Sequence, residues 1–433
     1  MELVPMSIAA IVSGSDIGAV RSVDSSRSNA AASPCTAVTS WSVSPLPNRV
    51  VTGSGSLRVR GSIVSPMEMI THPPAWDDEW TRVWSAERSN DRLQPARVVR
   101  IDKGGIQVAH EPGDDHHVVA AKAVRRVVVG DVVGVDVDAG RIETILDRRT
   151  VFERRSPGVQ RDELRLDARA LAANMDHVLV LQPLDGGVNP ARLCRELVLA
   201  WQSGATPIVV LTKADLADPA IVAEQRARAE LHAPGVPVVT ISTRAGTGLE
   251  SLRRTVGGED DTTPRVLALL GASGAGKSTL ANSLAGRAVA LTAEVRDHDR
   301  RGRHTTTAGQ MIELDASTWL IDTPGIRGVG LWASDDGLES AFVDLVPFAQ
   351  DCRFDDCTHR HEPGCALIAA VDSGAVPTER LDLWRQLADE IDDLEADLEV
   401  RDRAVGREEN QRARRRAARR GIPQDPGETG DQL

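Results

Sequence analysis

The residues with the clearest chemistry form a glycine-rich loop at 271–278, Gly-Ala-Ser-Gly-Ala-Gly-Lys-Ser. It matches the phosphate-loop pattern G-x-x-x-x-G-K-[ST], in which glycines let backbone N–H groups approach phosphate oxygens. Lys277 is expected to reach the β- and γ-phosphates of a nucleotide, and the Ser278 hydroxyl to bind Mg²⁺. The helix expected directly after the loop favours negative charge at its N-terminus. The predicted phosphate-binding set is Gly271, Ala272, Ser273, Gly274, Ala275, Gly276, Lys277, Ser278 and Thr279.

Two later segments carry residue types that would complete a magnesium and γ-phosphate site. Asp322 follows an apolar strand-like run and is expected to hold Mg²⁺ through water, while the Gly325 N–H senses the γ-phosphate. The threonine-rich segment 302–307 lies between the phosphate loop and Asp322 in the sequence and is typical of a first switch loop. Thr306 is expected to complete the Mg²⁺ shell with its hydroxyl, and two neighbours remain as alternatives, Thr305 and Thr307.

An apolar strand at 207–211 ends in Thr-Lys-Ala-Asp, a sequence suited to reading guanine. The Asp215 carboxylate can accept both N–H groups of the guanine edge, a match that adenine lacks. The Lys213 stem would lie over the base. Ala214, between Lys213 and Asp215 in the sequence, completes the predicted guanine-binding segment. Thr212 stands where most GTPases carry Asn, which alters one packing hydrogen bond, and we expect the guanine preference to survive. After the next strand, two residues would offer backbone groups to the base, Ser242 and Thr243.

The order of these segments is unusual. In most GTPases the guanine-reading segment follows the phosphate loop, whereas here Asp215 precedes Gly271. This order predicts a circularly permuted GTPase that uses GTP with Mg²⁺.

Three of the five cysteines fall in the pattern Cys352-x₄-Cys357-x-His359-x₅-Cys365, which predicts a closed Cys₃His zinc site. Four protein ligands leave no open position, so the zinc would be structural. His361 competes for the histidine position, and a set of unmetallated thiols is the alternative. Reduced thiols and a metal site fit the cytoplasm better than a disulfide framework.

The series T-K-A-D, S-T-R-A-G-T-G-L, G-A-S-G-A-G-K-S, G-R-H-T-T-T and D-T-P-G, followed by the cysteine cluster, resembles the bacterial ribosome-small-subunit-dependent GTPase A (RsgA, YjeQ) family. The resemblance covers roughly residues 93–400. It implies an oligonucleotide-binding (OB) barrel, a permuted GTPase domain and a C-terminal zinc domain. It also implies a role in late maturation of the 30S subunit, with 16S rRNA as a partner, and it favours His359 as the zinc ligand.

The secondary-structure elements expected around these motifs predict a multidomain chain. Short strands between Gly and Asp turns at 93–150 suit a small all-β barrel. Strands alternating with helices after it predict an α/β P-loop domain with a mostly parallel sheet, whose carboxyl edge holds the nucleotide. The zinc segment leads into a helix from residue 377 in a mainly α domain. The predicted parts are a low-complexity, disordered extension at 1–90, the barrel at 91–150, the GTPase domain at 151–332, the zinc domain at 333–402 and a basic, flexible tail at 403–433.

Within the extension, Met67 and Met69 are candidate translation starts, and residues 1–66 lie outside the resemblance. Trp76, Trp80 and Trp84 recur at a four-residue spacing, which predicts a packing stripe on one helix face.

Composition limits the partners. The net charge of −12 argues against a uniformly basic surface for nucleic acid, and the absence of Tyr argues against base stacking on the barrel. Local patches remain, either as RNA contacts or as solvated charges, including the basic run at 412–420. No apolar run reaches membrane-spanning length and the N-terminus lacks a basic secretory start, so we expect a cytoplasmic monomer with no membrane contact. The barrel cations that could meet phosphates are Arg97, Arg100, Lys103, Lys122, Arg125 and Arg126.

Hydrolysis is expected to be slow in the isolated protein. Ile326 occupies the place of the Gln that orients the attacking water in Ras-like enzymes, and an aliphatic side chain cannot orient water. His304, in the first switch, is the candidate catalytic residue within the chain, with a plain surface histidine as the alternative. GTP would order the switch loops and favour 30S docking, and the GDP form would leave. The competing functions are a phosphoryl-transfer kinase and an RNA-binding scaffold with little turnover.

Overall fold

The structure is a computed structural model of the chain, which divides into two compact units, Met1–Ser65 and Pro66–Leu433. The residues that the structure describes all lie in the second unit. They are residues 72–87, 92–124, 126–154, 169–257, 263–289, 309–322 and 335–394, together with 396 and 400.

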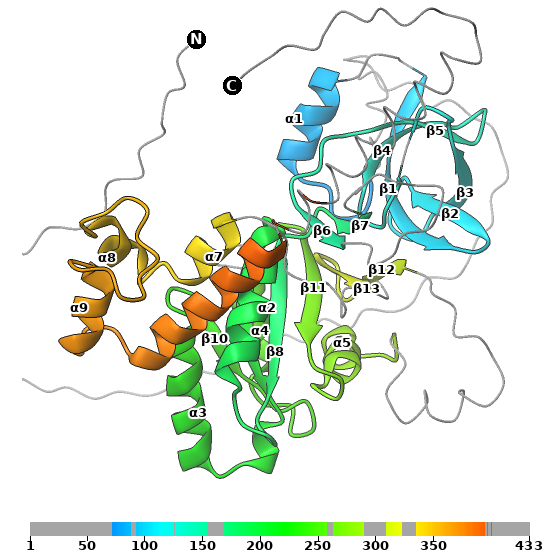
Figure 1. Cartoon of the computed structure of the whole chain (residues 1–433). Helices are drawn as coiled ribbons and strands as arrows, with labels where there is room; N and C mark the ends of the chain where they lie inside the picture. The colour runs from blue at the N-terminus through cyan, green and yellow to red at the C-terminus, as the bar shows by residue number, and fades with distance from the viewer. Residues whose placement is uncertain are drawn as a thin grey trace, which may run out of the picture. The chain divides into compact units, whose positions relative to one another are not determined.

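Long apolar strands build one part of an eleven-stranded sheet, in the spatial order β10-β9-β8-β11-β13-β12 (Figure 1). All neighbours in this part run parallel except β12, which pairs antiparallel with β13. Every interior residue of β8 is buried, as expected for parallel strands covered on both faces. The strands are β8 (His177–Pro183), β9 (Thr206–Thr212), β10 (Val238–Thr240), β11 (Arg265–Gly271), β12 (Gly309–Glu313) and β13 (Thr318–Asp322).

Helices cover both faces of these strands because side chains alternate between the faces along each strand. Val180 and Val209 share a buried cluster with Leu197 of α2. Leu181 and Ile208 point the other way, into a second cluster that includes residues of α4 and α5. The helices are α2 (Pro190–Gln202), α3 (Pro219–His232), α4 (Leu249–Gly257) and α5 (Lys277–Ala285).

The chain enters this sheet in its middle. It forms β8, β9 and β10 outward to one edge, and then returns to place β11 on the other side of β8. The strand that precedes the Thr212–Asp215 segment and the strand that precedes the phosphate loop therefore flank the same neighbour in parallel. Their carboxyl ends meet at one edge, as the permuted order of the motifs predicts.

Five strands that precede these in the sequence pair in a ring, β1-β2-β3-β5-β4 and back to β1 (Figure 1). Apolar side chains fill its interior, among them Val98, Val108, Val133 and Ile142. β1 also pairs with β12, so the ring and the parallel strands form one continuous sheet. The strands are β1 (Leu93–Asp102), β2 (Gly105–Ala109), β3 (Asp115–Ala120), β4 (Val132–Asp136) and β5 (Arg141–Ile145).

Helix α1 (Asp78–Glu87) precedes the ring, in the part of the chain that the sequence assigns to the low-complexity extension. Trp80 is buried and Trp76 nearly so, and both pack with Val132 and Leu146. Trp84 packs against the same cluster, so the three tryptophans form a packing surface, but Trp76 precedes the helix and does not lie on its face. A small separate sheet follows the ring, made of β6 (Val151–Arg154) and β7 (Arg169–Ala173).

Short helices and one longer helical segment, residues 378–394, form the C-terminal region, and the longer segment buries Leu381, Leu387 and Ile391. Gly337 allows α7 to approach α2, since a Cβ there would lie 2.3 Å from Gln202 Cγ. No helix in the described residues is both long and apolar enough to cross a membrane. The short helices are α7 (Asp335–Ala341), α8 (Val346–Gln350) and α9 (Ala366–Asp372).

Arg380 fastens the helical segment 378–394 to the α/β part of the chain. Its guanidinium is fully buried, pairs with Asp344 at 2.8 Å and donates to the carbonyl oxygens of His232 and Ala341 at 3.1 and 2.6 Å. It also lies 4.0 Å from the Phe342 ring centroid. A buried cation with this many partners fixes one docking geometry for the helix.

Candidate nucleotide and metal sites

The phosphate loop connects the carboxyl end of β11 to the first turn of α5 (Figure 1). Gly271, Gly274 and Gly276 have φ values of 139°, 80° and 93°, a region that favours glycine. At Gly271 a Cβ would also lie 2.8 Å from the Leu181 carbonyl oxygen. The loop therefore needs glycine at these positions to hold its backbone against β8.

Lys277 is held inside the curve of this loop. Its side chain is nearly buried, and its Nζ donates to the carbonyl oxygens of Gly271 and Ala272 at 2.7 and 2.6 Å. The ammonium group thus lies at the centre of the loop, where it would meet phosphate oxygens.

Ser278 lies in the first turn of α5, and Asp322 is the last residue of β13. Because Ala268 of β11 is the register partner of Ile321, Asp322 follows at the carboxyl edge beside the loop strand. The strand register therefore carries this carboxylate to the edge where the loop begins. Other predicted residues lie outside the described part of the chain, namely His304, Thr306 and Gly325.

Thr212, the last residue of β9, links the two predicted halves of the nucleotide site. Its hydroxyl donates to the carbonyl oxygen of Ala275 in the phosphate loop at 2.8 Å, and both residues are buried. A buried hydroxyl in place of the amide of Asn thus retains a hydrogen bond between the two segments.

The Lys213 backbone is left-handed, with φ 60°, and its Nζ pairs with Asp185 at 2.6 Å. This turn starts the short helix η1 (Ala214–Leu216), in which the Ala214 N–H donates to the Ile241 carbonyl. The turn leaves Asp215 exposed at the edge, where it can receive a base.

Ser242 orients the Asp215 carboxylate. Its Oγ donates to Asp215 Oδ1 at 2.6 Å and accepts the Ala245 N–H at 3.0 Å. The hydrogen bond from Ser242 is the main cause that lowers the pKa of Asp215, which therefore stays ionised and accepting. Thr243, directly after Ser242, is half-buried at the same turn.

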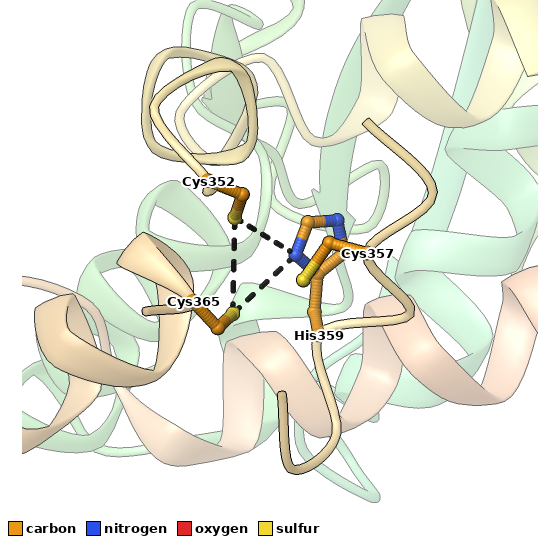
Figure 2. A group of neighbouring side chains, drawn as sticks. All are labelled: Cys352, Cys357, His359 and Cys365. Atoms are coloured by element: carbon orange, nitrogen blue, oxygen red, sulfur yellow. Dashed lines mark hydrogen bonds between the residues drawn. The ribbon is translucent and has the colours of Figure 1, made fainter. Parts of the chain in front are cut away.

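The predicted zinc ligands lie together in the C-terminal region, with one ligand atom of each within 4.8 Å of the others (Figure 2). His359 Nδ1 lies 3.4 Å from Cys352 Sγ and 3.5 Å from Cys365 Sγ, and Cys357 faces the same group. His361 is exposed and is not part of this group. The histidine that converges with the three sulfurs is therefore His359.

Neighbouring side chains fix the orientation of His359. Its backbone is left-handed, with φ 57°, and its ring packs edge-on against Trp384, with centroids 5.1 Å apart. Arg385 Nε donates to the His359 carbonyl at 2.9 Å. Burial lowers the pKa of His359, which favours the neutral imidazole that a metal requires.

Comparison with known proteins agrees with this geometry. The family model described as RsgA GTPase matches residues 145–332. A small ribosomal subunit biogenesis GTPase RsgA from Streptomyces coelicolor is 42% identical over 344 residues, which cover 78% of this chain and 91% of that protein. The chain belongs to the RsgA GTPase family. The relative of the same name from Streptomyces avermitilis is 40% identical and covers 77% of this chain and 88% of its own length.

The fold also matches that of a solved relative. The crystal structure of YjeQ from Thermotoga maritima aligns with a TM-score of 0.52 and 22% identity, over 69% of this chain and 98% of that one. This RsgA family member thus shares the fold of that protein over 69% of the chain.

Residues that the sequence did not single out also line the carboxyl edge. Glu196 of α2 accepts from the buried Gln182 at 2.7 Å, and burial raises the pKa of Glu196 to about 7 despite the nearby charges of Arg192 and Lys277. Asp185 could have been suspected because it follows β8 at this edge. Glu196 has no such signal, since an acidic residue on a helix usually faces solvent.

Proposed function

We propose that this protein binds GTP with Mg²⁺, hydrolyses it to GDP and phosphate, and acts in small ribosomal subunit maturation. The hydrogen bond from Thr212 to Ala275 carries the nucleotide part of the proposal, because it ties a guanine-reading segment to a phosphate loop. Relatives at about 40% identity, named small ribosomal subunit biogenesis GTPases, support the ribosomal part.

Different residues at the carboxyl edge would bind the base, the phosphates and the Mg²⁺ ion. Asp215 would accept the two N–H groups of guanine, and the Lys213 stem would lie on the base, with its ammonium held at Asp185. Backbone N–H groups of the loop and Lys277 would bind the phosphates. Ser278, in the first turn of α5, and Asp322, at the end of β13, would hold Mg²⁺ together with Thr306. The ion would neutralise the β- and γ-phosphate charge.

Orientation of the attacking water stays a prediction for His304 or for a partner, because Ile326 offers no polar group. The rate should therefore depend on what docks beside the switch segments. A passive scaffold would not need a lysine at the centre of the loop, where Lys277 lies. A kinase would not need Thr212 and Asp215 beside the loop.

The cysteine cluster supports a structural zinc ion. Three sulfurs and one imidazole nitrogen within 4.8 Å of one another fit a closed tetrahedral Zn²⁺ site, formed by Cys352, Cys357, His359 and Cys365. With four protein ligands, zinc would hold the segment between α8 and α9 in place and would leave no position for substrate.

The ring β1–β5 supports an OB-type barrel that contacts 16S rRNA on the 30S subunit. Its pairing order closes five antiparallel and parallel strands in the way such a barrel requires. The exposed cations of the ring include Lys103 and Lys122. Arg97 is not available, because it is buried, and this corrects the expectation that it meets phosphates from the barrel surface. We propose a cytoplasmic monomer between rounds of docking.

A substitution of Asp215 that changes the preferred base tests the guanine assignment. Asp215→Asn replaces an acceptor by a donor, so GTP affinity should fall at least about 100-fold while xanthosine triphosphate, whose edge matches Asn, gains. Binding and turnover of GTP, ATP and xanthosine triphosphate measure this, with Asp218→Asn at the start of α3 as the control. A preference of the unaltered protein for ATP would contradict the assignment.

A further inference from the structure

A pocket of about 490 Å³ lies at the end of the parallel strands opposite to the nucleotide edge. The first residues of β8, β9 and β11 line it, together with α1 and β1. None of the residues assigned above to nucleotide or zinc belongs to it. The charged and aromatic residues that line it include Asp77, Glu79, Trp80, Arg97, Arg149 and Arg265, with Asp176 and His177 beside them.

Arg97 is the central feature of this pocket, at 1% exposure. Its Nη2 donates to the Asn174 carbonyl at 3.1 Å. Within the described residues, its Nε and Nη1 have no hydrogen-bond partner. Burial lowers the pKa of Arg97 to about 10, so it remains a cation at neutral pH. A buried cation with two unused donors is costly unless an anion meets it.

The acidic side chains of the pocket are largely engaged elsewhere. Both oxygens of Asp77 pair with Arg149, at 2.6 and 2.9 Å, and Glu79 lies 3.4 Å from the same guanidinium. Asp176 accepts the Val266 N–H at 2.6 Å. Three carboxylates and three guanidiniums line the pocket, and its unpaired hydrogen-bonding atoms among the described residues lie on the basic side chains.

Further donors are unsatisfied at the same place. The buried Nε atoms of Arg149 and Arg265 and the Nδ1 of His177 have no partner in the part of the chain that is described. Arg149 stacks on Trp80 at 3.9 Å, which holds its guanidinium plane in position. Four different side chains thus offer N–H groups, or a ring nitrogen, around one cavity.

We propose that this pocket binds a small phosphate-bearing molecule, with its phosphate oxygens on Arg97 and Arg265. Phosphate offers the charge and the several acceptor oxygens that these donors lack. The volume is within the range of small-ligand sites. A pocket of about 490 Å³ accommodates a small molecule and not a stretch of RNA backbone. The site does not depend on the proposed GTPase activity.

Thermal unfolding of the full chain tests this site, with Mg²⁺ and a non-hydrolysable GTP analogue present in excess so that the phosphate loop is filled. Inorganic phosphate and ribose 5-phosphate are titrated against sodium chloride at matched ionic strength. The melting temperature should rise with the logarithm of phosphate concentration, by about 3 °C or more at saturation. Ribose 5-phosphate acting at lower concentration would identify a phosphate ester, and inorganic phosphate acting equally well would identify the free ion.

Arg97→Met, which keeps the length of the stem, should abolish the rise. Arg100→Met, three residues along the same strand and paired with Asp102 outside the pocket, should retain it. If Arg97→Met does not fold, Arg97→Lys provides the second variant and should need at least about tenfold more phosphate, because a single ammonium replaces the fork of donors. An equal response from the Arg97 variant, no response beyond chloride, or a response to an RNA oligonucleotide alone would overturn the proposal.

Discussion

Thr212 shows how one side chain can hold two sequence-distant segments in register. Its hydroxyl reaches the Ala275 carbonyl at 2.8 Å, between the strand that leads to Asp215 and the loop that would bind phosphate. A base and a phosphate chain belong to one ligand, so holding their two binding segments in place before the ligand arrives should raise affinity.

Thr212→Val tests this link, because it removes the hydroxyl and keeps the shape. The Ala275 carbonyl would lose its buried donor, so the affinity for GDP should fall about 5- to 30-fold, equivalent to about 1–2 kcal/mol. Fluorescent GDP analogues measure the Kd. Thr240→Val is the matched control, since the buried Thr240 hydroxyl has no partner among the described residues. An unchanged Kd in Thr212→Val would contradict the role of this bond.

Glu196 gives the nucleotide edge a pH dependence. Burial raises its pKa to about 7, so between about pH 4.5 and 7 the folded protein keeps a proton that the unfolded chain releases. Stability of the unaltered protein should therefore fall as pH rises through this window, and Glu196→Gln should not share that loss.

The difference in melting temperature between Glu196→Gln and the unaltered protein should be small at pH 5 and grow to a few degrees at pH 8. Glu224→Gln, an exposed glutamate on α3, should show a difference that does not change with pH. A constant difference for Glu196→Gln would place its carboxylate in a solvated environment instead.

At the scale of elements, the segment between α8 and α9 depends on its four converging side chains. It buries little apolar surface of its own, and the loop geometry places His359 in a left-handed conformation. We expect the metal to supply the stability that packing does not.

Cys357→Ser should reduce zinc from one ion per chain to well below one and lower the melting temperature. Cys194→Ser is the control, because Cys194 is buried in α2 away from the cluster, and it should retain the full zinc content. Elemental analysis of the purified proteins measures this. Full zinc content in Cys357→Ser would remove Cys357 from the ligand set.

Local motifs explain why much of the site was predictable from the sequence. The glycines of 271–276 and the Cys₃His spacing encode their geometry within a few residues, and the parallel strands carry continuous apolar runs. Glu196, Asp185 and Arg97 could not be predicted in the same way, because their surroundings come from segments distant in sequence. Arg97 has the alternating pattern of a surface cation, yet residues 174–177 cover it.

At the scale of the whole described unit, the β1–β12 pairing joins the ring to the nucleotide sheet. Gly309 and Gln310 of β12 pair with Ile101 and Arg100 of β1. β12 is thus paired on one side with the nucleotide sheet and on the other with the proposed RNA-binding ring. We predict that this pairing couples GTP turnover to docking of the ring.

Dependence of the GTPase on the small subunit is tested by GTP turnover of the purified protein alone, with 30S subunits and with 50S subunits, with ATP as the control nucleotide. We predict slow turnover alone, a many-fold increase with 30S subunits only, and no comparable hydrolysis of ATP. Equal turnover under all three conditions, or a preference for ATP, would contradict a GTPase whose activity depends on the small subunit.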